Sequence, residues 1–299
     1  MPRLEKGRVL VLGGQGMLGH VVVDRLRDSG MADVVWTTRG AGEGALRFNV
    51  LDGPARLRQV IEQAGPPRWI VNCIAVLQSQ IDERNPDSVR LAERINTEFP
   101  LHLATIAAEV GASILHISTD AVFPPGAGRC AERTPPGPAN VYARTKLHGE
   151  IVADNVLNLR CSIVGPDPWH RRGLIEWLRS RPAGSRVPGF TNQQWVGATT
   201  YQVAELCRVL ITEGFFEEAV REGPVHHFCP CEPVSKYELL RQAVMALHAD
   251  VEVLPTVSEQ QVTRQLDTNY RAITARFPKY GRLDAALAAL TPRPREQAA

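Results

Sequence analysis

The segment from Val9 to Gly19 has the sequence VLVLGGQGMLG, and it decides the fold class. Its first four residues are aliphatic or β-branched, a pattern typical of a buried parallel strand. Two glycine patterns end at Gly19: GxGxxG starts at Gly14, and GxxGxxG starts at Gly13. Apolar residues at helical spacing follow over residues 17–27. A glycine-rich turn between a strand and a helix is the context in which such patterns bind a dinucleotide.

The backbone of this turn is expected to approach the pyrophosphate of the dinucleotide. Glycine permits positive φ angles and has no side chain to keep a ligand away. The N-terminus of the following helix supplies unpaired N–H groups and a partial positive charge. We therefore predict cofactor-binding residues throughout the turn: Gly13, Gly14, Gln15, Gly16, Met17, Leu18 and Gly19.

The alternation of short apolar strands with helices continues through the first half of the chain. Strands are expected at residues 33–37, 69–73, 113–118 and 156–163, and helices at residues 54–64, 88–110 and 141–154. Pro100 lies inside the longest of these helices, where a boundary or kink is expected. Strands that alternate with helices form right-handed crossovers, which predicts an α/β fold with a Rossmann-type doubly wound parallel sheet.

The regular alternation ends near Gly165, and the organisation of the chain changes there. Before it, residues 123–140 form a loop rich in Pro and Gly, and long loops of this kind are often functional. We predict a dinucleotide-binding Rossmann domain over residues 1–165. A smaller mixed α/β C-terminal substrate region is expected over residues 166–290, with some segments returning to the Rossmann sheet. Residues 291–299 are expected to form a disordered tail.

Composition and charge exclude several classes of protein. A formal net charge of +2 over 299 residues gives no extended basic surface for nucleic acid. The six cysteines form no CxxC pair, so no metal site is expected, and we interpret the thiols as free in a reducing compartment. The start of the chain is polar, and no apolar run is long enough for a signal segment or a membrane span. We expect a cytoplasmic protein without nucleic-acid or membrane partners.

The end of the second strand distinguishes between the two nicotinamide cofactors. An acidic residue there would bind the adenosine ribose diol and favour NAD. The sequence after Asp33 is instead VVWTTR, which contains no acid up to Arg39. Arg39 can pair with a ribose 2′-phosphate, and Thr37 and Thr38 can donate hydrogen bonds to it. NADPH is therefore the predicted cofactor, and NADH stays open as the alternative.

The sequence also contains a set of residues suited to proton transfer. Tyr142 and Lys146 are four residues apart in a predicted helix, so their side chains lie on one face. Thr119 and Asp120 follow a predicted strand, at the carboxyl edge where such sheets bind ligands. Reduction of a ketone by hydride leaves an alkoxide that needs a proton, and the Tyr142 phenol can donate it. Thr119 would donate a hydrogen bond to the carbonyl oxygen of the substrate and polarise it. We expect the Lys146 ammonium to lower the pKa of that phenol from its usual value of ~10.

Four motifs occur in a characteristic order: LGGQGMLG (12–19), HISTDAVF (116–123), YARTKLHGE (142–150) and LRCSIVG (159–165). In this order they resemble the extended short-chain dehydrogenases/reductases, and most of all the dTDP-4-dehydrorhamnose reductase group. The resemblance implies NADPH-dependent reduction of a keto group, at C4, in a nucleotide-activated deoxysugar. Such a reaction belongs to sugar or polysaccharide biosynthesis.

The same resemblance implies cofactor contacts outside the glycine turn. The backbone of Cys73, Ile74 and Ala75 matches a strand end that borders the cofactor. Asn49 and Val50 fall where the family contacts the adenine. Asn49 departs from the family pattern, which commonly has Asp at this position, although an amide can still bind adenine.

Catalytic and substrate roles follow from the resemblance as well. Asn96 matches an asparagine that supports the catalytic lysine through the helix backbone or water. Trp195 falls near the nucleotide-sugar site, where its ring would stack on a base or cover the sugar. The implied catalytic residues are Thr119, Tyr142, Lys146 and Asn96, and the implied substrate contacts are Thr119, Asp120, Tyr142 and Trp195.

One departure keeps the substrate and the reaction open. Ala121 stands where the reductases usually have Tyr and where the related dehydratases have an acid, so dehydration is disfavoured. A nucleotide-sugar epimerase that keeps NAD bound is one alternative. A non-catalytic cofactor-binding regulatory subunit is another, because a regulatory subunit of methionine adenosyltransferase resembles the same group. The sequence does not fix the oligomeric state, and a homodimer is one arrangement that it allows.

Overall fold

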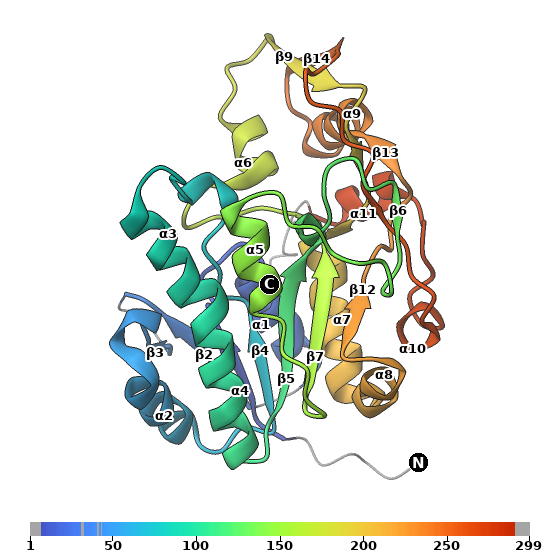
Figure 1. Ribbon diagram of the computed structural model, residues 1–299. Coiled ribbons are helices and arrows are strands. Elements are labelled where there is room, and N and C mark those ends of the chain that lie inside the picture. Colours follow the sequence, from blue (N-terminus) through green and yellow to red (C-terminus); the bar gives the residue numbers. More distant parts are fainter. Residues whose placement is uncertain (1–6, 31–32, 41, 43, 291–299) are drawn as a thin grey trace, which may run out of the picture.

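A parallel β-sheet forms the centre of the protein (Figure 1). The computed structural model describes residues 7–290 except 31, 32, 41 and 43. The central strands are β1 (Val9–Leu12), β2 (Val34–Thr38), β3 (Leu46–Arg47), β4 (Trp69–Asn72), β5 (Ser113–Thr119), β7 (Val156–Cys161) and β12 (Val225–His227). Their order is β3–β2–β1–β4–β5–β7–β12, and every neighbouring pair is parallel. The order reverses between β1 and β4, so the predicted doubly wound Rossmann-type sheet is confirmed.

Helices cover both faces of this sheet. They are α1 (Gly19–Asp28), α2 (Gly53–Ala64), α3 (Pro86–Glu93), α4 (Phe99–Glu109), α5 (Val141–His148), α7 (Thr200–Thr212) and α8 (Phe216–Glu222). Val9 and Val11 of β1 belong to a core shared with α1 and α7, whereas Leu10 and Leu12 belong to a core shared with α2 and α4. Side chains alternate between the two faces of a strand, which explains why this strand is apolar throughout.

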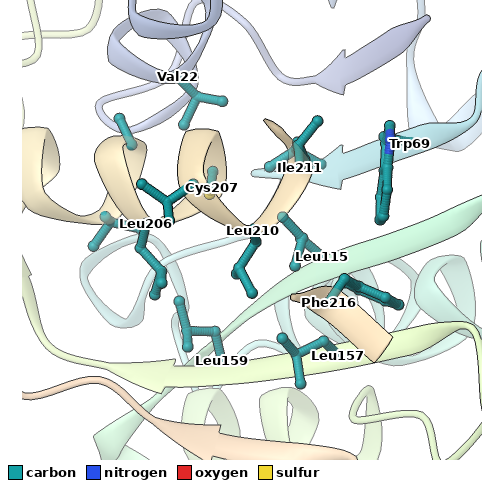
Figure 2. Packing of buried hydrophobic residues seen from close by; sticks show 14 of the residues in the cluster. Val22, Trp69, Leu115, Leu157, Leu159, Leu206, Cys207, Leu210, Ile211 and Phe216 are labelled. Atoms are coloured by element: carbon teal, nitrogen blue, oxygen red, sulfur yellow. The ribbon is translucent and has the colours of Figure 1, made fainter. Parts of the chain in front are cut away.

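Helix α7 comes from the second half of the chain but completes the first of these cores. Its residues Leu206, Cys207 and Leu210 pack with Leu115 and Leu157 of the sheet (Figure 2). β12 also comes from the second half, and it pairs with β7 at the edge of the sheet. Segments beyond residue 166 are therefore part of the Rossmann architecture.

The long helix expected around Pro100 is interrupted. A π-helical turn, Arg94–Glu98, separates α3 from α4. Pro100 has no N–H and so cannot donate to the carbonyl of Asn96, four residues earlier. The expected boundary is confirmed, and the wider turn directs the buried Asn96 side chain toward α5.

Two predicted elements are shorter than expected. The helix predicted over residues 141–154 ends at His148, because a side chain at Gly149 would overlap the Asn96 carbonyl oxygen. The strand predicted over residues 156–163 is divided at Ser162, whose hydroxyl and carbonyl bond to residues of the smaller region.

The smaller region lies beyond the carboxyl ends of the central strands, toward which the arrowheads of β5 and β7 point in Figure 1. Its helices are α6 (Gly173–Arg179), α9 (Lys236–Leu247) and α11 (Leu283–Ala288). The short helix α10 (Arg271–Thr274) packs on α8, and its Ala272 and Ile273 belong to the core shared with α1 and α7. Short strands lie in the smaller region and in the loops that connect it to the central sheet. They are β6 (Arg129–Cys130), β8 (Ile163–Val164), β9 (Ser185–Phe190), β10 (Gln194–Trp195), β11 (Ala198–Thr199), β13 (Val234–Ser235), β14 (Val251–Thr256) and β15 (Gln265–Leu266). Single 3₁₀ turns are η1 (Val50–Asp52), η2 (Gln78–Gln80) and η4 (Asp120–Val122).

The described residues contain no helix both long and apolar enough to cross a membrane. Within the same residues, no three or more His, Cys, Asp or Glu side chains are grouped as metal ligands. All six cysteines are free thiols. The predicted tail, residues 291–299, lies outside the described residues.

Candidate active site

The glycine turn after β1 has the geometry of a phosphate-binding turn. Gly13 has a φ of 83°, which favours glycine, and the Gly16 N–H donates to the Gly13 carbonyl at 2.9 Å. A side chain at Gly19 would overlap the same carbonyl, so α1 can begin against the turn only because residue 19 has none. No described side chain caps the start of α1, and its first N–H groups are therefore available to an anionic ligand.

The end of β2 differs in part from the expected 2′-phosphate site. Thr37 is buried, and its hydroxyl accepts a hydrogen bond from the Gly13 N–H at 3.1 Å. The Thr38 hydroxyl donates to the Gly40 carbonyl at 2.7 Å. The expectation that the Thr38 hydroxyl would be free to donate to a phosphate is therefore wrong, because its proton is used within the turn, whereas the Thr37 hydroxyl only accepts and keeps its own proton. Arg39 is exposed, and Asp33 forms an ion pair with Arg8 at 2.9 Å, before β2 begins.

The loop after β4 is held by two buried asparagines. The Cys73 N–H donates to the Leu12 carbonyl at 3.1 Å, which places this loop beside the glycine turn. Asn72 accepts from the Ile74 N–H at 3.1 Å, and Asn96 exchanges hydrogen bonds of 2.9 and 3.0 Å with the backbone of Val76. The hydrogen bonds of Asn72 and Asn96 therefore fix the backbone of the loop that contains Cys73, Ile74 and the partly exposed Ala75.

Asn49 and Val50 lie at the end of β3, both partly exposed. The Asn49 side chain accepts from the Leu51 N–H at 3.1 Å and caps η1. Capping is a task that Asp performs equally well, which accounts for an amide at a position where an acid was expected.

The predicted catalytic pair, Tyr142 and Lys146, lies on α5, as the spacing predicted. Tyr142 lines a cleft of about 630 Å³ together with Leu77, Gln78 and Ser79. Lys146 is buried, and its Nζ donates to the Ile117 carbonyl at 2.7 Å. α5 is thus fixed against β5 at the carboxyl edge of the sheet.

Burial changes the pKa of both members of the pair. Burial raises the pKa of Tyr142 to about 12, and the hydrogen-bonding side chain of Thr119 opposes this rise. Burial lowers the pKa of Lys146 to about 8, against the attraction of the Glu150 carboxylate. The expectation of a lowered Tyr142 pKa is therefore wrong for the protein without ligands, because burial outweighs the contacts that favour the phenolate.

Thr119 and Asp120 follow β5 at the same edge. The Thr119 hydroxyl accepts from the Ala121 N–H at 3.2 Å and makes only a long contact of 3.4 Å to the Asp120 carboxylate. Asp120 is held by Arg264, whose Nε donates to it at 2.8 Å and whose Nη1 donates to the Phe123 carbonyl at 3.0 Å. The Thr119 side chain therefore contacts both Tyr142 and Asp120, and Asp120 is firmly fixed.

Asn96 supports this arrangement from behind α5. Its amide donates to the Thr145 hydroxyl at 3.2 Å, and the neighbouring Thr97 hydroxyl donates to the Thr145 carbonyl at 2.8 Å. It makes no direct hydrogen bond to Lys146 within the described part of the chain. Its contacts are those of a residue that positions the catalytic helix.

Trp195 is placed differently from the stacking role that was expected. Its ring is buried in the core of the smaller region, and its Nε1 donates to the Ser162 hydroxyl at 3.0 Å. These contacts are those of a packing residue.

Two side chains of the site were not identified from the sequence. Arg264 is 144 positions from its partner Asp120, so no local pattern relates them. His116 stands in the motif HISTDAVF, but its apolar strand context gave no indication of its contact with Lys146 at 3.5 Å.

Comparison with known proteins agrees with this fold and this order of motifs. The sequence profile described as RmlD substrate binding domain matches residues 7–292. A dTDP-4-dehydrorhamnose reductase of Streptomyces griseus is 38% identical over 151 residues, which span 50% of this chain and 46% of that protein. The methionine adenosyltransferase 2 subunit beta of Danio rerio is 36% identical over 267 residues, or 85% of this chain and 78% of that one.

Among solved structures, the chain is similar to a dTDP-4-dehydrorhamnose reductase from Bacillus anthracis in complex with NADP. The TM-score is 0.74 at 18% identity, with 95% of this chain and 98% of that chain covered. This likeness concerns the fold, whereas the profile match extends over nearly the whole sequence. The chain therefore belongs to the RmlD substrate binding domain family, in its dTDP-4-dehydrorhamnose reductase-like group.

Proposed function

We propose that this protein reduces a keto group, at C4, in a nucleotide-activated deoxysugar, with NADPH as the reductant. The observation that carries the proposal is the position of Tyr142 at a cleft of about 630 Å³, one helical turn from the buried Lys146. The uncapped start of α1 and the glycine turn fit the pyrophosphate of a dinucleotide. When bound there, NADPH supplies the hydride.

The protein's own residues manage the proton and the developing charge. With a pKa of about 12, the Tyr142 phenol is protonated at neutral pH and can donate to the alkoxide oxygen. The Lys146 ammonium stabilises the phenolate that remains. The Thr119 hydroxyl, which contacts Asp120 at 3.4 Å and hydrogen-bonds the Tyr142 side chain, can turn its proton to the substrate carbonyl.

Cations from the smaller region suit an anionic substrate. Arg264 lies beside Asp120, and Lys236 donates to Gln193 at 2.7 Å. Burial and the charge of Arg264 lower the pKa of Lys236, against the opposite effect of Asp120. The positive charge of Arg264 and Lys236 at the strand end that carries Thr119 supports a substrate with a diphosphate, as in a nucleotide-linked sugar.

The direct test is a panel of dTDP-, UDP- and GDP-linked 4-keto sugars. We expect NADPH oxidation, followed by its absorbance, with at least one nucleotide series and formation of the corresponding alcohol. A protein that oxidises NADPH with none of these sugars, under conditions where it binds NADPH, contradicts the proposal.

The rate of reduction is expected to fall as pH rises through about 8. The Lys146 ammonium is present below its pKa of about 8 and is lost above it, whereas the Tyr142 phenol stays protonated up to about 12. The kcat for NADPH oxidation should therefore be level on the acid side and decline on the alkaline side, measured from about pH 6 to about pH 10. A kcat that increases over this range would show that the ammonium is not required.

Replacing Arg39 with Ala is expected to weaken NADPH binding by roughly 10- to 100-fold and to leave NADH binding unchanged. Arg39 is the exposed cation at the end of β2, and the neighbouring Thr38 hydroxyl donates to the Gly40 carbonyl instead. Titration of both cofactors by fluorescence measures the effect. The matched control is Arg58→Ala, because Arg58 lies on α2 and is paired with Glu109. Equal affinity of the parent protein for the two cofactors would remove the case for a 2′-phosphate contact.

A second candidate function is that of a non-catalytic cofactor-binding subunit. It is favoured by the 36% identity to a protein named methionine adenosyltransferase 2 subunit beta. Co-elution with a methionine adenosyltransferase, unaffected by Tyr142→Phe, would support it. Turnover of a 4-keto sugar that disappears in the same variant would support the reductase.

A further inference from the structure

Buried polar contacts connect the predicted cofactor loop with the amine of Lys146. The Ile74 N–H donates to Asn72 Oδ1 at 3.1 Å, and Asn72 Nδ2 lies 3.0 Å from His116 Nδ1. The other ring nitrogen, His116 Nε2, lies 3.5 Å from Lys146 Nζ. Asn72, His116 and Lys146 are at most 2% exposed, so solvent does not take the place of any of these partners.

These contacts determine which ring nitrogen of His116 carries the proton. Because the Ile74 N–H occupies Asn72 Oδ1, the amide presents its NH₂ group to His116. An NH₂ group only donates, so Nδ1 must accept and a neutral ring must carry its proton on Nε2. A doubly protonated ring is disfavoured, because burial and the charge of Lys146 hold the pKa of His116 well below its usual range.

The Nε2–H group then points at Lys146 Nζ. An amine can accept this hydrogen bond while it donates to the Ile117 carbonyl at 2.7 Å. An ammonium has no lone pair and would place N–H against N–H. His116 in this tautomer therefore holds the lysine in place and favours its uncharged form.

The other ionisable groups that face Lys146 either favour its ammonium form or are uncharged. Glu150 and the thiols of Cys161 and Cys73 would each favour the ammonium if charged. Burial raises the pKa of the Cys73 thiol, which is neutral at ordinary pH. Glu150 is already bound by Arg160 through two hydrogen bonds of 2.8 and 2.7 Å, so much of its charge is compensated.

We propose that His116 is a positioning residue for Lys146: through its Nε2–H group it holds the uncharged amine against the Ile117 carbonyl and limits the fraction of the ammonium, the form that the proposed reduction uses. The inference deepens the proposed reduction and depends on it for its kinetic consequence. Asn72 then orients both the predicted cofactor loop and the ring of His116. The tautomer itself is a property of the folded protein and needs no substrate.

The first experiment reads the tautomer directly. Histidine labelled with ¹⁵N is incorporated, and the His116 ring is identified by its absence from the spectrum of His116→Phe. We expect the proton on Nε2 at neutral pH in the parent protein. In Asn72→Asp, an isosteric acceptor replaces the NH₂ group, and the proton is expected on Nδ1. A parent ring protonated on Nδ1, or on both nitrogens, overturns the proposal.

The second experiment follows the alkaline decline of kcat. In His116→Phe no N–H group faces the amine, so the decline should move to higher pH by about one unit. The new carboxylate of Asn72→Asp also favours the ammonium by its charge, so that variant is used to read the tautomer alone. His226→Phe is the matched control, because His226 is equally buried in the same sheet but bonds the Ala219 carbonyl at 2.8 Å. Its decline should stay at the parent position.

Failure of the His116 role and failure of the proposed reduction give different results. A decline that stays at the parent pH in His116→Phe, with NADPH binding retained, overturns the positioning role. If His116→Phe does not fold, the Asn72→Asp variant and the spectrum of the parent protein still decide the question. A protein that reduces no sugar fails the proposed function, but the position of the histidine proton remains measurable.

Discussion

Replacing Tyr142 with Phe is expected to lower the kcat for reduction by about 10²- to 10⁴-fold, the usual contribution of a positioned proton donor. The phenol stands at the cleft with its proton retained up to about pH 12, so its loss removes the donor to the alkoxide. The ring itself stays, and NADPH binding should change little. Steady-state kinetics with the best sugar of the panel, together with a cofactor titration, measure both quantities.

A phenol elsewhere on the protein provides the control for this variant. Tyr201→Phe removes a hydroxyl from the exposed side of α7, where the ring lies next to Arg25. This variant should keep the parent kcat. Full activity of Tyr142→Phe would mean that water or another group donates the proton, and the assignment of α5 as the catalytic helix would be lost.

Replacing Glu150 with Gln is expected to destabilise the fold by roughly 3–5 kcal/mol, because it leaves a buried guanidinium without its counter-ion. Glu150 and Arg160 are only 6% exposed, and two hydrogen bonds of 2.8 and 2.7 Å join them. The Ser118 hydroxyl also donates to the carboxylate at 2.6 Å. Urea unfolding followed by tryptophan fluorescence gives the difference in free energy of unfolding.

An exposed pair of the same length is the control for Glu150. Arg186 and Glu252 join β9 to β14 at 2.7 Å, but their side chains are 72% and 56% exposed. Glu252→Gln should therefore cost less than about 1 kcal/mol. Equal losses in the two variants would show that burial does not strengthen the dependence of Arg160 on its partner.

The periodic parts of the fold could be predicted from the sequence because each depends on neighbours in the chain. The apolar run of β1, the glycine turn and the spacing of Tyr142 and Lys146 are all local patterns. The interruption before α4 was predictable for the same reason, since Pro100 lacks a donor wherever it stands.

The predictions that were wrong depended on contacts between distant segments. α5 ends early because Gly149 lies against the Asn96 carbonyl, and no local pattern contains that contact. Trp195 was placed at the sugar because an aromatic side chain looks the same in a sequence whether it packs in a core or lines a site.

Helix α7 has a practical consequence for anyone who wishes to divide this protein. A fragment that stops at residue 165 would retain β1, β4, β5 and β7 but would lack the apolar surface of Leu206, Cys207 and Leu210. The uncovered strands would expose a hydrophobic surface that can associate with other chains, and the fragment should therefore aggregate. Recombinant halves intended for reconstitution should therefore be co-expressed, or cut after residue 212 so that the helix stays with its partners.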